Sequence, residues 1–181
     1  STVAASITLG ASYKDIAGNT GTGADAPSIA IDTVIPTVVI TSSVDALKAN
    51  EVALITFTFS EAPADFTNED ITLVGGSLSD VTVDPSDAAI YTATFTPTAE
   101  STGAASITMG SSSKDIAGNT GTGADAPSIA LDTATPTVVI TSTVDALKAN
   151  AVALLTFPFS EAPANSTHAD ITLAGGSFSA A

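Results

Sequence analysis

The residues of this chain that are best suited to chemistry are acids and amides grouped in a glycine-rich stretch. The stretch reads Asp-Ile-Ala-Gly-Asn-Thr-Gly-Thr-Gly-Ala-Asp at 115–125, and it recurs unchanged at 15–25. It has no apolar periodicity, so we expect a surface loop rather than part of a core. Its glycines allow the backbone to adopt positive φ and fold back on itself. A loop so rich in oxygen atoms has the chemistry of a binding site for a hard cation.

The chain repeats with a period of 100 residues. Residue n is identical to residue n + 100 at 62 of the 81 positions that can be compared, 1–81 against 101–181. A period of this length is too long for one turn of a solenoid and suits a small β-sandwich. We therefore predict the C-terminal part of one repeat (1–33), a complete repeat (34–133) and the N-terminal part of a third (134–181).

The charge balance is strongly acidic. Nineteen Asp and Glu face four Lys and Arg, for a net charge of −15, and there is no cysteine. Nucleic acid is excluded as a partner because phosphate binding requires clustered basic residues. No apolar run is long enough to span a bilayer, so we expect no direct membrane insertion. Divalent cations would relieve the repulsion among so many carboxylates.

Short strands separated by turn residues fill the complete repeat. Seven strands are predicted, at 37–41, 52–59, 70–74, 78–83, 90–96, 105–109 and 128–131, with a turn at 42–50 that includes one helical turn at 46–48. Their number and spacing predict an all-β, immunoglobulin-like sandwich in a tandem array. The expected core side chains follow the inward phase of each strand: Val39, Ile55, Phe57, Phe59, Ile71, Leu73, Tyr91, Phe95, Ile107 and Ile129.

The up-and-down course of such strands brings three acidic segments to one end of the complete repeat. These are the incoming linker at 31–33, the loop at 61–70 and the loop at 115–125. Their carboxylates and one amide suit Ca²⁺, which takes six to eight oxygen ligands, whereas zinc would favour His or Cys. The predicted calcium ligands are Asp32, Glu61, Asp65, Asp70, Asp115, Asn119 and Asp125. The alternative is that these residues only form turns and cap strand ends.

Several motifs resemble those of bacterial Ig-like repeats from secreted, biofilm-associated and RTX-type adhesins. They are Asp-Ile-Ala-Gly-Asn-x-Gly at 115–121, Thr-Phe-Thr-Phe-Ser-Glu-Ala-Pro at 56–63, Asp-Ile-Thr-Leu-Val-Gly-Gly-Ser-Leu-Ser at 70–79, Tyr-Thr-Ala-Thr-Phe-Thr-Pro at 91–97 and Asp-Thr-x-x-Pro at 32–36. The resemblance implies an extracellular stalk at the bacterial cell surface, with linkers stiffened by calcium. The third repeat departs from the pattern, since Asn165, Ser166, His168 and Ala169 replace Asp65, Phe66, Asn68 and Glu69.

No set of residues indicates an enzyme. His168 is the only histidine, and it replaces an Asn in an otherwise repeated loop, so a Ser-His-Asp triad is not expected. Glycines 18, 21 and 23 lack the lysine of a phosphate-binding loop. Paired carboxylates such as Glu69 and Asp70 would need a cleft and aromatic platforms to act on sugars, and the chain contains no Trp.

We therefore expect a structural spacer whose partners are the neighbouring repeats of the same chain. Identical chains in a surface fibre are further possible partners. Two alternatives stay open at this point. Exposed strand edges in the incomplete repeats could build a filament by strand addition, or the loops of the sandwich could bind a sugar or a partner protein.

Overall fold

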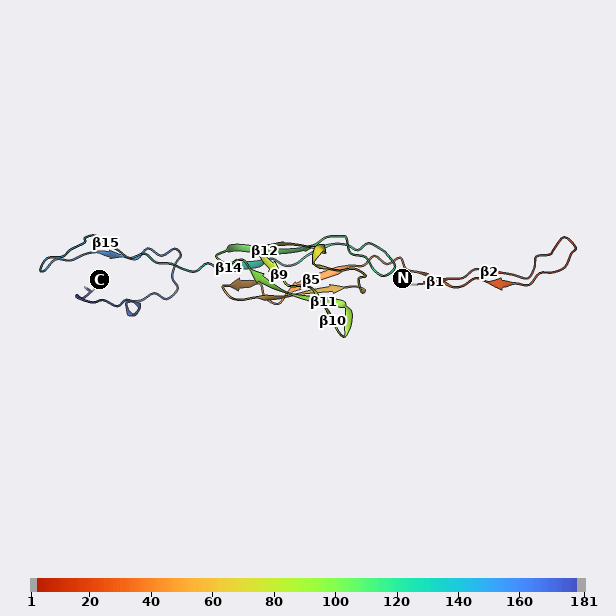
Figure 1. Ribbon diagram of the computed structural model, residues 1–181, viewed down its shortest axis with the longest axis horizontal. Helices are drawn as coiled ribbons and strands as arrows, with labels where there is room; N and C mark the ends of the chain where they lie inside the picture. The colour runs from red at the N-terminus through yellow and green to blue at the C-terminus, as the bar shows by residue number, and fades with distance from the viewer. Residues whose placement is uncertain (1–2, 179–181) are drawn as a thin grey trace. The chain divides into compact units, whose positions relative to one another are not determined.

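The described part of the chain is all-β. A computed structural model describes residues 3–178, which form two compact units that divide after Ala134. Each unit is described by itself below, and Figure 1 shows their strands. Within the described residues no helix is long and apolar enough to cross a membrane.

The complete repeat in the first unit is a sandwich of two five-stranded sheets. In the first sheet the order is β10-β11-β7-β5, with β9 also paired to β11. All pairs in this sheet are antiparallel. Its strands are β5 (Val38–Ser42), β7 (Ala53–Phe59), β9 (Gly76–Leu78), β10 (Thr82–Asp84) and β11 (Asp87–Pro97).

The second sheet has the order β13-β12-β14-β6, with β8 also paired to β12. Its strands are β6 (Ala46–Lys48), β8 (Ile71–Val74), β12 (Thr102–Met109), β13 (Ala124–Asp125) and β14 (Ile129–Asp132). A one-turn 3₁₀ helix, η1 (Asn68–Asp70), precedes β8. Since only β6 and β14 run parallel, the fold is almost entirely antiparallel.

The core lies between the two sheets and follows the alternation of the strands. Along β7 the buried positions are every second residue, from Ala53 to Phe59. Fully buried side chains from both sheets fill the interior, chiefly Ile55, Phe57, Phe95, Ile107, Met109 and Ile129. Ile71, Leu73 and Tyr91 are half-buried and pack against this core. The prediction of an all-β sandwich is therefore confirmed.

Residues 3–33 form two short ladders before the sandwich begins. They are β1 (Val3–Ala5) with β4 (Ile29–Ile31), and β2 (Thr8–Leu9) with β3 (Ala24–Asp25). Ile29 is 52% exposed, whereas its counterpart Ile129 in the complete repeat is 1% exposed. The same side chain is thus core in the complete repeat and surface in residues 3–33, where the described strands form only these two-stranded ladders.

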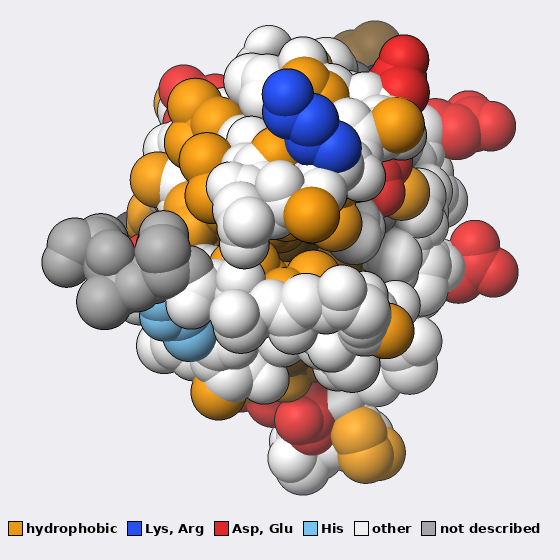
Figure 2. All heavy atoms as spheres, turned by 90° about the vertical axis from the view of Figure 1, so that its left-hand side faces the viewer, with side chains coloured by type: hydrophobic (Ala, Val, Ile, Leu, Met, Phe, Trp, Pro, Cys, Tyr) orange, Lys and Arg blue, Asp and Glu red, His pale blue; other side chains and the backbone are white. Residues whose placement is uncertain are grey.

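The second unit, described for residues 135–178, has a strand pair that matches β5 and β7. It has β15 (Thr141–Ser142) paired with β16 (Leu155–Thr156), and a 3₁₀ turn η2 (His168–Asp170). Thr141 pairs with Thr156 as Thr41 pairs with Thr56 in the complete repeat. Figure 2 shows hydrophobic side chains on the surface at this end, and those exposed in the unit include Val139, Ile140 and Leu154.

Three predictions within the complete repeat were wrong. Residues 46–48 form strand β6 rather than a helical turn, because they pair with β14 at the sheet edge. Val39 is 60% exposed while Val38 and Ile40 are buried, so the inward phase of β5 is shifted by one residue. The strand predicted at 78–83 is divided between β9 and β10, since β11 pairs with both.

Candidate metal centre

Three carboxylates from distant parts of the chain meet where the linker enters the complete repeat. Asp32 comes from the linker, Glu61 from the loop after β7, and Asp115 from the loop between β12 and β13. One carboxylate oxygen from each lies within 4.8 Å of the others. Asp115 is buried, at 3% exposure, and the other two are half-buried. Carboxylates this close repel one another unless a proton or a cation lies among them.

The linker is attached to Asn119 and Thr122 by hydrogen bonds that its backbone carbonyl oxygens accept. The Asn119 side-chain N–H donates to the Asp32 carbonyl oxygen at 3.1 Å. The Thr122 N–H donates to the Pro36 carbonyl oxygen at 3.0 Å. Gly121 allows this approach, since a Cβ there would lie 3.1 Å from the same Pro36 oxygen. These hydrogen bonds therefore hold the linker at Asp32 and at Pro36 without the help of an ion.

The 115–121 loop is organised by Asp115 itself. Its carboxylate accepts hydrogen bonds from the Asn119 backbone N–H at 2.8 Å and from the Asn119 side-chain N–H at 2.8 Å. Gly118 has a φ of +93°, which lets the chain reverse inside the loop. Burial acts to raise the pKa of Asp115, but the hydrogen bonds from Asn119 and from the Gly118 and Ala117 backbone lower it below its usual value. Asp115 is thus held as a carboxylate.

The 61–70 loop is aligned with the 115–121 loop by a short ladder. Pro63 bridges Asp115, and the Ala64 N–H donates to the Lys114 carbonyl oxygen at 2.7 Å. The carboxylate of Asp65 accepts from the Lys114 N–H at 3.2 Å. This pairing brings Glu61 to the same side as Asp115.

Phe66 anchors the 61–70 loop in the core, and the sequence analysis did not identify this role. Its side chain is 7% exposed, and its ring lies 5.0 Å from Phe59, 5.1 Å from Phe57 and 5.2 Å from Tyr91 between centroids. A single aromatic residue in an otherwise polar loop was the available signal. Its counterpart Ser166 cannot make these contacts.

Glu61 is the least satisfied of the three carboxylates. Its Oε1 is buried and has no hydrogen-bond partner among the described residues. Burial, followed by the charges of Asp32 and Asp115, raises the pKa of Glu61 above its usual value. Within residues 3–178 no lysine forms an ion pair with any of the three carboxylates. The oxygen of Glu61 therefore lacks a compensating positive group or donor there.

The chemistry of this set fits a hard divalent cation. Ca²⁺ takes carboxylate and carbonyl oxygens and tolerates irregular geometry, and no His or Cys stands here for zinc. A carboxyl with a raised pKa beside an ionised one also occurs in glycoside hydrolases. In this repeat, however, Phe57, Phe59 and Phe66 pack in the core and offer no sugar platform.

The remaining predicted ligands lie elsewhere or have other partners. Asp65 bonds to the Lys114 backbone, as above. Asp70 caps η1 by accepting from the Thr67 N–H at 3.0 Å, and it accepts from the Ser112 hydroxyl at 2.5 Å. Asp125 is exposed in β13 opposite Thr108. The structure thus brings together Asp32, Glu61, Asp115 and Asn119, and leaves Asp65, Asp70 and Asp125 out of the cluster.

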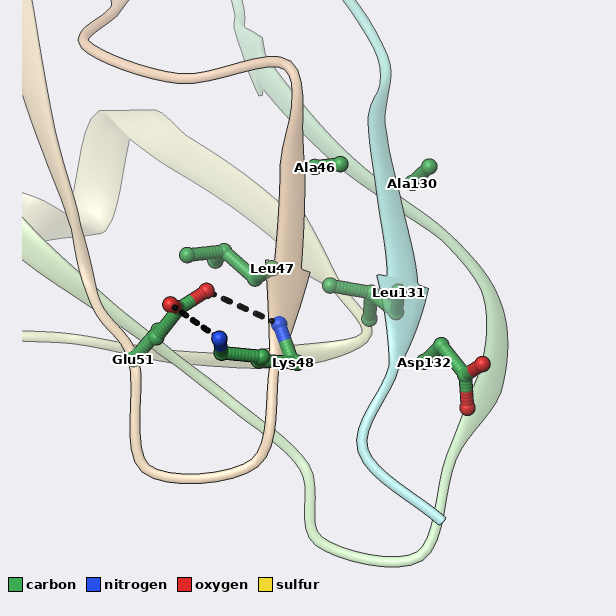
Figure 3. Close-up of a pocket in the computed structure, with 7 residues that line it drawn as sticks. All are labelled: Ala46, Leu47, Lys48, Glu51, Ala130, Leu131 and Asp132. Carbon is green, nitrogen blue, oxygen red and sulfur yellow. Dashed lines mark hydrogen bonds and ion pairs between the residues drawn. The ribbon is translucent and has the colours of Figure 1, made fainter. Parts of the chain in front are cut away.

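The complete repeat also has a shallow groove beside its edge strand, shown in Figure 3. The groove has a volume of about 290 Å³ and lies along β6 and β14. Leu47 and Leu131 line it, and Lys48 and Glu51 form an ion pair of 3.4 Å at its rim. These side chains present no set of groups for catalysis or metal binding.

Comparison with known protein families agrees with this architecture. A family described as "Bacterial Ig-like domain" matches residues 32–130 and 132–181. No curated protein matches the chain. A solved structure of FdeC, described as an Escherichia coli adhesin, shares 14% identity with a TM-score of 0.44 over 89% of this chain. The chain spans 62% of the length of that structure.

Proposed function

Because this chain belongs to the bacterial Ig-like domain family, we propose that it is a structural spacer of an extracellular adhesin or surface fibre. Its partners are then the neighbouring repeats of the same chain. The 62 identities in 81 comparable positions support this role, since a spacer needs repetition whereas a binding tip needs only one specific surface. The resemblance to secreted, biofilm-associated and RTX-type adhesins supports a location outside the bacterial cell.

Calcium at Asp32, Glu61 and Asp115 would stiffen the joint between repeats. The observation that carries this proposal is the meeting of a linker carboxylate with two loops of the following domain. The unpaired Glu61 oxygen supports it further. A bound divalent cation supplies positive charge to these oxygens, and binding it would hold the linker and both loops together.

The test is thermal unfolding of the chain in millimolar calcium and in excess chelator. Calcium should raise the melting temperature, because a ligand at 100 times its Kd stabilises the folded state by about 2.7 kcal/mol. Asp115→Asn should abolish most of this rise. Its matched control is Asp15→Asn, since Asp15 makes the same local bonds to Asn19 but is not in the cluster.

An unchanged melting temperature of the wild-type chain would reject the calcium site. If Asp15→Asn and Asp115→Asn reduced the calcium-induced rise in melting temperature equally, calcium would act on the two loops themselves rather than on the carboxylate cluster at the joint. The magnesium salt at the same concentration distinguishes a site selective for calcium from one that takes any divalent ion.

A further inference from the structure

The outer face of the first sheet lacks charge, although the chain as a whole is strongly acidic. Outward positions of β5, β7 and β11 carry Thr, Val, Leu, Ile and Ala, and none of them carries an ionisable group. The outer face of the second sheet differs, because Asp125, Asp132 and Lys48 are exposed there. The first sheet therefore offers a face without charge on a chain whose net charge is −15.

A row of threonines crosses the first sheet, and we call this surface the threonine face. Thr41, Thr56, Thr92 and Thr82 are direct cross-strand partners on β5, β7, β11 and β10. The row is flanked by Val39, which is 60% exposed, and Leu54, which is 49% exposed. The face therefore combines hydroxyl groups with exposed aliphatic side chains.

We infer that the threonine face binds the same face of a second copy of this chain. A hydroxyl group is both donor and acceptor, so a surface of hydroxyls can be complementary to itself, as a two-fold contact requires. Carboxylates cannot pair with one another in this way. Since the net charge is −15, two copies repel one another wherever acidic surfaces are opposed, and the neutral face is where sheets can approach to about 10 Å.

The small area of the face means that one such contact between two copies would bind weakly. Several contacts between chains that carry repeated copies of the face would bind more strongly. Four strands spaced about 4.8 Å apart and about five residues long cover on the order of 300 Å². A stable interface needs roughly 800 Å² per partner. The pattern returns in the second unit, where Val139, Thr141, Leu154 and Thr156 occupy the corresponding positions. Linked copies of a weak contact bind far more tightly than one.

Other partners fit this face less well. The aromatic rings Phe57, Phe59 and Phe66 contact one another in the core of the complete repeat, so they offer sugars no platform on this face. Polyanions and anionic lipids need basic side chains, and the outward positions described above carry none.

The test is sedimentation of the full chain over rising concentration, in chelator so that calcium has no part. The wild type should self-associate weakly, and salt should strengthen the association because it screens the repulsion between acidic copies. Thr58 is exposed on this face beside the threonine row, opposite Val39 and Ile90. Thr58→Asp adds a negative charge to each of the two opposed faces and should weaken association about tenfold or more.

Thr72→Asp is the matched control. Thr58 and Thr72 are both exposed threonines in mid-strand, but Thr72 lies on the outer face of the second sheet, opposite Thr108. The control should associate like the wild type, and circular dichroism should show both variants folded. If the wild type stays monomeric at millimolar concentration in high salt, or if both variants weaken association equally, the inference is overturned.

Discussion

The properties of single residues at the joint follow from burial among like charges. Glu61 has a raised pKa, because of its burial and then the charges of Asp32 and Asp115. Asp115, which accepts bonds from Asn119, has a lowered pKa although it is buried. The pKa values of two carboxyl groups in one cluster are thus shifted in opposite directions. The hydrogen bonds explain the difference, since Asp115 has donors and the Glu61 Oε1 has none among the described residues.

Glu61→Gln should stabilise the metal-free chain near pH 7 and remove its response to calcium. The folded state binds the Glu61 proton more tightly than the unfolded state does. The contribution of Glu61 to stability therefore falls as pH rises from its usual value near 4.5 through the raised value, and it stays low above that. The gain in stability from Glu61→Gln should accordingly shrink as the pH is lowered through the range between the raised pKa of Glu61 and its usual value.

Melting temperatures measured from pH 3 to pH 8 in chelator will check this prediction. Glu51→Gln is the control, because Glu51 lies beside Lys48 rather than in the cluster. A gain from Glu61→Gln that does not change with pH would show that the unpaired charge is not its cause.

At the scale of elements, the site depends on how the 61–70 loop is held. An isolated β-bridge between Pro63 and Asp115 and a hydrogen bond from the Ala64 N–H to the Lys114 carbonyl oxygen set its alignment. Phe66 attaches the loop to the core. The plane of the Phe66 ring makes angles of 65° and 87° with the rings of Phe59 and Tyr91. Such edge-to-face contacts are favourable for aromatic pairs. A core residue thus anchors the loop that carries the half-buried carboxylate of Glu61.

Phe66→Ser, which installs the residue found at position 166, should destabilise the chain by about 3–5 kcal/mol. It should also weaken calcium binding, because the loop that carries Glu61 loses its anchor. The suitable control is Phe95→Ala, since Phe95 is fully buried on β11 but belongs to no element of the joint. Calcium affinity measured by titration calorimetry should fall in Phe66→Ser and stay unchanged in Phe95→Ala. Equal affinities in the two variants would deny Phe66 a positioning role.

At the scale of the whole molecule, we expect the linker at 32–36 to couple one repeat to the next. Asn119 and Thr122 hold it by hydrogen bonds to backbone oxygens, and Pro36 restricts the residue before it to extended conformations. Charge works against this attachment in the absence of a cation, because oxygens of the Asp32, Glu61 and Asp115 carboxylates lie within 4.8 Å of one another.

Removing calcium should therefore broaden the distribution of distances between repeats, measured by small-angle X-ray scattering of the chain. Excess chelator leaves the carboxylates of the joint unneutralised, so they should push the linker away from the loops. High salt should reduce the effect by screening. Identical scattering curves in calcium and in chelator would mean that hydrogen bonds alone determine the direction of the linker.

Alternation along the strands and local turn chemistry were readable from the sequence. The alternating phase of β7 and the burial of Ile107 and Ile129 followed from their patterns. Residues 46–48 and Val39 were misjudged, since a three-residue edge strand and the phase of a short apolar run depend on their neighbours. In Val38-Val39-Ile40 every residue is apolar, so only the packed sheet decides which ones face inward.

The identical segments 14–30 and 114–130 separate what sequence determines from what tertiary structure decides. Both loops fold alike: the Asp15 N–H donates to Asn19 and the Asp115 N–H to Asn119, and Gly18 and Gly118 have φ of +90° and +93°. Only Asp115 is buried and meets Asp32 and Glu61. Local hydrogen bonds need only nearby residues and so follow the sequence. Burial and the meeting of three carboxylates need strands and loops far along the chain, and only the assembled sandwich supplies them.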